Sequence, residues 1–171
     1  MRLASCPRIV EYELTRSQDH RRVYEIEGVG SLRFGGILAR RATAQAGATA
    51  WSFDRGGFWR TTIKASDATG AVVGSFDPRS IRRGGSLRWG DHDLVLRPAS
   101  TWKERYALVE HDNELAVLDA KSWGKRPLKI TVAQPDVVEP GLVLFAAFVV
   151  RQLADDASAV AGGAAAAAAT G

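Results

Sequence analysis

Apolar and polar residues alternate through most of this chain, from Ile9 to Val132. In the first such segment Val10, Tyr12 and Leu14 alternate with Glu11 and Glu13. A period of two predicts a half-buried β-strand, because successive side chains of a strand point to opposite faces of a sheet. The same pattern predicts short strands within residues 9–14, 23–26, 37–45, 51–54, 59–65, 71–76, 87–89, 94–96, 106–110, 115–118 and 128–132.

Tight turns separate these segments, at Asp54–Gly57, Asp67–Gly70, Gly90-Asp91 and His111–Asn113. Short strands about 8–12 residues apart, joined mainly by hairpins, are typical of an antiparallel sandwich or barrel. We therefore expect a mainly β fold, a closed antiparallel barrel of about ten to twelve strands. Closure removes exposed strand edges and encloses an interior that has to be filled.

The segment Gly141–Leu153 differs from everything before it, since it is apolar on every helical face up to Arg151. A helix of this kind is buried all round or placed in lipid, and this one is too short to span a bilayer. Pro140 suits the first position of a helix. We predict a central buried helix over 140–155, within a barrel domain of 8–156. The flank 1–7 is expected to be flexible, and the alanine-rich flank 157–171 to be disordered or weakly helical.

Composition and charge narrow the function only slightly. The 171 residues carry a formal charge of +4, with 23 Lys and Arg against 19 Asp and Glu, less than a dedicated nucleic-acid binder usually shows. The one cysteine, Cys6, permits no internal disulfide, and the N-terminal residues do not form a signal peptide. We expect a cytoplasmic protein with no transmembrane segment, no nucleic-acid partner and no cofactor.

Several of these features together resemble the tubby C-terminal-like superfamily, near the LURP-one-related proteins and the phospholipid scramblases. They are the hairpin Trp51…Phe53…Gly56-Gly57…Trp59, the turn Asp67–Gly70, the pair Trp89-Gly90 and the single apolar C-terminal helix. The resemblance covers about residues 8–156. It implies a barrel threaded by its own helix and a protein that is mostly non-enzymatic, with lipid binding as a property of the superfamily. The cysteine-rich and acidic calcium-binding segments of scramblases are not found here.

The segment Arg79–Arg88 is the best candidate for a binding site, since it carries four arginines around two glycines. Arginine forks and exposed backbone N–H groups bind phosphate. The candidate anion-binding and lipid-binding residues are Arg79, Arg82, Arg83, Arg88, Lys121, Lys125 and Arg126. A solvated loop whose arginines aid solubility is the alternative interpretation of the same segment.

Other candidate chemistry is weaker. Trp51, Trp59 and Trp89 alternate with polar neighbours and are predicted to face the core, whereas Trp102 and Trp123 lie in lysine-bearing connections that suit a lipid interface. Histidine and aspartate recur in the turns around 91–93 and 111–114, where they serve turn geometry, so no metal site is expected. No nucleophile elbow, dinucleotide fingerprint or phosphate-binding loop occurs, and we expect no enzyme activity.

The expected function is therefore a non-catalytic barrel that binds an anionic ligand, such as a phospholipid headgroup, at the inner face of the membrane. A protein-interaction or scaffold barrel without a lipid ligand is the alternative.

Overall fold

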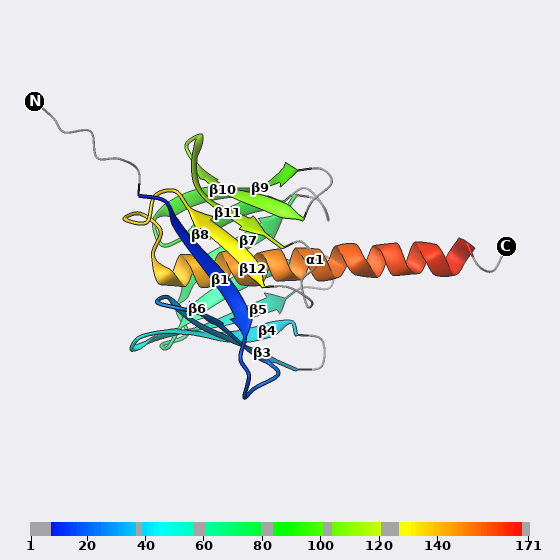
Figure 1. The fold of residues 1–171 in the computed structure, drawn as a ribbon, viewed down its shortest axis with the longest axis horizontal. Helices are drawn as coiled ribbons and strands as arrows, with labels where there is room; N and C mark the ends of the chain where they lie inside the picture. The colour runs from blue at the N-terminus through cyan, green and yellow to red at the C-terminus, as the bar shows by residue number, and fades with distance from the viewer. Residues whose placement is uncertain are drawn as a thin grey trace, which may run out of the picture.

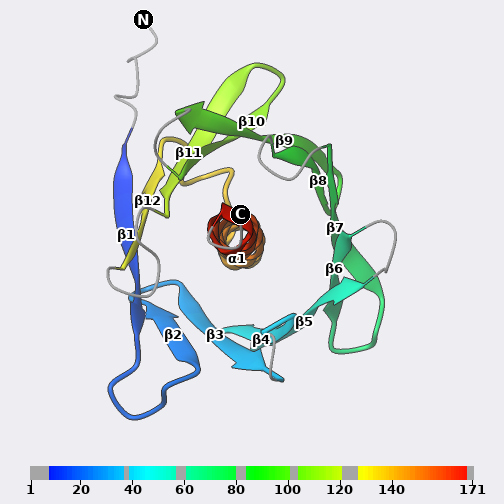
Figure 2. The same cartoon turned by 90° about the vertical axis from the view of Figure 1, so that its right-hand side faces the viewer.

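Twelve antiparallel strands close into a barrel around one helix (Figures 1 and 2). The computed structural model describes residues 8–36, 39–56, 61–79, 84–100, 104–120 and 127–168, with side chains of the last stretch to residue 159. The strands are β1 (Val10–Arg16), β2 (Val23–Ile26), β3 (Gly30–Gly35), β4 (Arg41–Ala46), β5 (Thr49–Gly56), β6 (Thr62–Asp67), β7 (Val72–Pro78), β8 (Gly85–Trp89), β9 (His92–Ser100), β10 (Arg105–Glu110), β11 (Asn113–Asp119) and β12 (Leu128–Val132), and the helix is α1 (Pro140–Ala168). The predicted fold class is confirmed.

Each strand pairs with the next along the chain, and β1 pairs with β12 to close the ring. The alternation that predicts the strands is also what fills the barrel. In β12, for example, Leu128, Ile130 and Val132 point inward and are each 1% exposed, while Lys129 points outward and is exposed. The polar outer face and the apolar inner face therefore follow directly from the sequence period.

The helix occupies the axis of the barrel, as Figure 2 shows. Leu144, Phe145, Phe148 and Val150 are all completely buried, although they lie on different sides of the helix. Aromatic rings of the wall pack against them, with Phe53 at 5.2 Å from Phe145 and 5.6 Å from Phe148 between ring centroids. A closed sheet of this size needs such a filling, and α1 supplies it.

The helix is longer than the sequence predicts. It ends at Ala168 rather than near Asp155, so residues 157–168 continue the helix where a disordered or weakly helical tail is expected. Alanine has the highest helix propensity, and a buried stem removes the cost of nucleating the helix. Figure 1 shows α1 leaving the barrel and continuing beyond it.

The two ends of the barrel differ in how α1 passes through them. The entry end is where Pro140 begins α1, and the exit end is where α1 leaves. Because neighbouring strands are antiparallel, the connections β1–β2, β3–β4, β5–β6, β7–β8, β9–β10 and β11–β12 join strand ends at the exit end. The remaining strand connections, and the segment from β12 to α1, join strand ends at the entry end.

Gly141 is the closest point of contact between α1 and the entry end. A Cβ at this position would overlap Trp89 and lie 2.8 Å from Cζ2 of Trp51. The two indoles pack together at 6.0 Å between ring centroids and cover the first turn of the helix. Trp89 is 3% exposed, as the sequence predicts, and Trp51 is partly buried against the core. Trp59 lies outside the described residues.

We predict that Gly141→Ala lowers the free energy of unfolding by about 1–3 kcal/mol, since an added methyl group forces the indoles apart and overpacking typically costs this much. Chemical denaturation followed by tryptophan fluorescence measures the change. Gly56→Ala is the control, because a Cβ there has no heavy atom within 4 Å. Equal stability of Gly141→Ala and the unsubstituted protein would contradict the tight fit.

Candidate functional site

Along the described part of α1, residues Leu142 to Val150 are at most 4% exposed, so the inward side chains of the wall pack against the helix there. Gln152 is the one buried polar side chain among the described residues, at 2% exposure. The hollows described below lie on the outer wall.

The structure separates two of the predicted site residues. Arg79 follows β7 at the exit end and is exposed, while Arg88 lies near the entry end of β8. Arg88 pairs with Ser75 in the β7–β8 ladder, four residues before Arg79 along the strand, which is roughly 13 Å at the usual rise per residue. Arg79 and Arg88 therefore lie toward opposite ends of the β7–β8 ladder and do not gather at one point.

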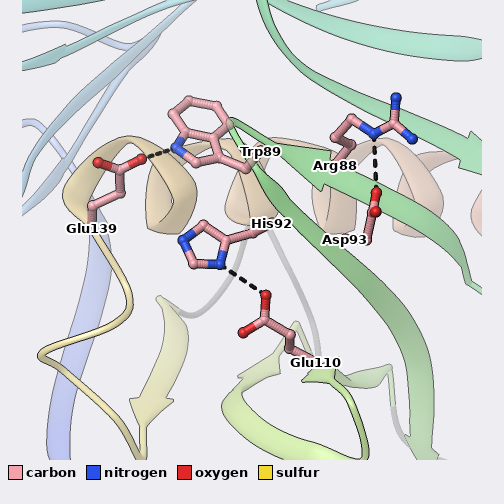
Figure 3. A network of polar contacts seen from close by, with 6 residues as sticks. All are labelled: Arg88, Trp89, His92, Asp93, Glu110 and Glu139. Atoms are coloured by element: carbon pink, nitrogen blue, oxygen red, sulfur yellow. Dashed lines mark hydrogen bonds and ion pairs between the residues drawn. The ribbon is translucent and has the colours of Figure 1, made fainter.

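Arg88 is already engaged by a carboxylate. Its Nε lies 3.0 Å from Oδ1 of Asp93 on β9, and both side chains are largely exposed (Figure 3). The pair borders a shallow hollow of about 390 Å³ that also contains Asp77 and two serines. Acidic and basic groups are mixed there, so this part of the wall does not favour an anion.

The packing of the barrel wall requires both glycines of the predicted site. Gly84 and Gly85 are buried, and a Cβ on either would overlap a backbone carbonyl, that of Leu96 or Asp77 respectively. Gly84 also has a φ of +76°, and its carbonyl accepts a hydrogen bond from the N–H of Arg79 at 3.1 Å. Packing therefore accounts for both glycines, and their expected role in exposing N–H groups stays a prediction. Arg82, Arg83, Lys121, Lys125 and Arg126 lie outside the described residues.

Charge is distributed very unevenly between the two ends. In sequence, the exit-end connections contain eleven basic residues and two acidic ones, Asp19 and Glu104. The basic residues are Arg21, Arg22, Arg40, Arg60, Arg79, Arg82, Arg83, Lys103, Lys121, Lys125 and Arg126. Among them Arg21, Arg22, Arg40 and Arg79 are described, and all four are exposed.

The entry-end connections contain no lysine or arginine and five acidic residues, namely Glu27, Asp91, Asp112, Asp136 and Glu139. Several carboxylates at this end have structural roles. Glu139 accepts a hydrogen bond from the indole of Trp89, and Oε1 of Glu110 lies 2.8 Å from Nδ1 of His92 (Figure 3). Asp67 accepts hydrogen bonds from the hydroxyl and N–H of Thr69, which lower the pKa of its carboxyl group.

A buried polar cluster, which the sequence does not reveal, holds α1 where it leaves the wall. Nε2 of Gln152 donates to the carbonyl of Ala39 at 2.9 Å, and Oε1 of Gln152 accepts from Nη1 of Arg55 at 3.3 Å. Nη2 of Arg55 also pairs with Oδ2 of Asp156 at 2.7 Å. The Arg55 side chain is 14% exposed, so this contact is well shielded from water. The cluster fixes the rotation of α1 relative to β5.

The largest hollow that we describe lies on the outer wall between β1 and the turn that joins β2 to β3. Its volume is about 1120 Å³, and four glutamates line it together with Tyr12 and Val29 on its floor. The four are Glu11, Glu13, Glu25 and Glu27. We call this hollow the acidic groove. No local sequence pattern points to it, because its residues come from several turns and strands.

The described residues do not assemble a metal site, since no group of three or more His, Cys, Asp or Glu side chains converges among them. Nor does any described helix combine the length and the hydropathy that crossing a membrane requires. Burial, with a smaller contribution from Glu104, raises the pKa of Tyr106, whose side chain lines neither hollow.

Comparison with protein-family models, curated proteins and solved structures finds no match to this chain. The resemblance to the tubby C-terminal-like superfamily therefore stays a prediction from the sequence.

We predict that Arg55→Met lowers the free energy of unfolding by about 1–3 kcal/mol, because it removes partners from the buried Gln152 and from Asp156. Arg41→Met is the matched control. Arg41 pairs with Asp54 at 3.4 Å, but its side chain is 78% exposed, and such surface pairs contribute about 0–1 kcal/mol. Urea denaturation of both variants gives the comparison, and equal losses would contradict a special role for the buried cluster.

Proposed function

We propose that this chain is a non-catalytic binding module whose exit end docks on an anionic phospholipid surface. The observation that carries the proposal is the segregation of charge between the two ends. Basic residues close to an anionic membrane contribute about 1 kcal/mol each, and the effect declines within a Debye length. A barrel whose connections are basic at one end and acidic at the other is attracted to such a surface in one orientation.

A surface suits this distribution better than a single small anion. A small phosphate needs several donors that converge on one point, whereas these basic residues belong to six different connections around the ring. The cytoplasmic leaflet carries the anionic lipids, so the proposal places the protein at the inner face of the membrane.

The composition of the same connections supports an interface between lipid and water. Their sequences include Phe58, Trp59, Trp102 and Trp123, next to or near basic residues. These four residues lie outside the described part of the chain. Aromatic side chains with a polar atom are enriched at membrane surfaces, where one end of the ring is apolar and the other hydrated.

Co-sedimentation with vesicles tests the proposal. We expect the protein to pellet with vesicles of phosphatidylcholine and phosphatidylserine at low salt, and to stay in solution with phosphatidylcholine alone. Arg82→Glu with Arg83→Glu should weaken binding by roughly 30-fold or more, because losing two basic contacts removes about 2 kcal/mol. Raising the salt concentration should release the unsubstituted protein.

The matched control is Lys64→Glu with Arg97→Glu, which makes the same change in net charge at two exposed positions on the outer wall. This control should bind anionic vesicles more tightly than the Arg82 and Arg83 variant. Equal binding to neutral and anionic vesicles would refute the proposal, and so would equal loss in both double variants.

A further inference from the structure

The ladder between β1 and β2 is incomplete, and this leaves part of β1 with a neighbour on one side only. Val10 to Leu14 pair with β12, whereas β2 pairs only with Leu14 to Arg16. Among the described residues, no strand therefore flanks Val10–Glu13 on the side that faces β2. The open side is the wall of the acidic groove.

The backbone groups on that open side can be assigned. The N–H of Ser17 donates to the carbonyl of Val23 at 2.8 Å, so Ser17 directs its backbone groups toward β2. Because N–H and C=O groups alternate in direction along a strand, Thr15, Glu13 and Glu11 direct theirs the same way. The ladder stops at Leu14, so the backbone groups of Glu11 and Glu13 point into the groove.

The β2–β3 turn explains the gap. The chain reverses at Glu27–Val29, where Gly28 has a φ of +74° and the N–H of Val29 bonds to the carbonyl of Ile26 at 3.0 Å. The neighbouring β4–β5 hairpin reaches further, and its Gln45 and Gly47 line the far side of the groove. A segment of about four residues, roughly 13 Å long, would continue the sheet there.

We propose that the acidic groove binds a basic extended segment of another protein, which adds a strand to the free side of β1. Main-chain hydrogen bonds to Glu11 and Glu13 give such a segment its register. Its alternate side chains face the floor at Tyr12 and Val29 or point outward among the glutamates. Outward lysine or arginine then lies opposite carboxylates, which is a favourable cross-strand pairing.

The charge of the groove selects this occupant over a second copy of the chain. Pairing of two copies through the same edge would bring Glu11 and Glu13 of one against those of the other. Like charges directly opposite one another destabilise a sheet, and charged edge strands oppose self-association. The proposed partner is thus basic and extended, and this site is independent of the exit end that the proposed function uses.

The probe is a capped eight-residue peptide in which lysine alternates with valine, labelled for fluorescence anisotropy and titrated with the full chain. We expect saturable one-to-one binding. The same peptide N-methylated at alternate residues keeps every charge but lacks donors along one edge, and it should bind at least about tenfold more weakly. Equal affinity of the two peptides would overturn strand addition.

The protein-side variant is Glu11→Lys with Glu27→Lys, which reverses two charges of the groove and leaves Glu13, which lies 3.5 Å from Lys129, unchanged. Binding of the unmethylated peptide should fall by about tenfold or more. Asp91→Lys with Glu114→Lys is the control with the same change of charge at two exposed entry-end positions, and it should retain most of the affinity. Equal loss in both variants would overturn the proposal, as would no binding at millimolar peptide.

Two further readouts complete the test. Amide exchange of Glu11 and Glu13 should slow on peptide addition, since their N–H groups become hydrogen-bonded, and unchanged exchange at saturation would contradict the site. Sedimentation equilibrium of the protein alone should show no dimer formed by pairing of two β1 edges. If the protein forms a dimer and the double variant Glu11→Lys with Glu27→Lys is a monomer, the occupant of the groove is a second copy. That result would overturn the proposal of a basic partner.

Discussion

The filling of the barrel by α1 is the packing constraint on which the rest of the structure depends. Twelve strands enclose more space than their own side chains occupy, and an α-helix with its side chains is about 10–12 Å wide. Helix residues from Leu142 to Val150 are at most 4% exposed, so the wall contacts them on every side. The apolar character of this segment on all faces is the sequence equivalent of that enclosure.

A helix on the axis requires both ends of the barrel to fit around it. The contacts that hold the helix differ between the two ends. At the entry end Trp51 and Trp89 close over Gly141, and Glu139 satisfies the indole N–H. At the exit end the wall holds the helix through buried hydrogen bonds and an ion pair centred on Arg55 and Gln152. In sequence, the connections at the entry end are acidic and those at the exit end are mostly basic. The proposed membrane surface and the proposed peptide groove are consistent with this polarity.

The ladder between β1 and β2 is incomplete, and the gap coincides with the acidic groove. β1 pairs with β12 along its first half and with β2 along its second, so Leu14 is where the pairing changes sides. The barrel closes through this strand, yet Glu11 and Glu13 keep backbone groups directed into the open side. Exposed edges of this kind are a hazard unless charge protects them, and the glutamates here supply that charge.

Most of the strands, their inward residues and the buried helix follow from the sequence alone, because period-two alternation and an all-apolar helix are local patterns that only a few architectures satisfy. The sequence did not reveal β3, whose Leu32 and Phe34 alternate inward between Gly30 and Gly35, nor the end of α1, where alanine extends a helix that the barrel has nucleated. Arg79 and Arg88 were both predicted as anion-binding residues, but the distance between them depends on the register of the β7–β8 hairpin. The segregation of charge, the Arg55 cluster and the acidic groove depend on which connections share an end and where β2 stops. These three features are properties of long-range strand pairing. No local pattern encodes such pairing, so they are visible only in the folded chain.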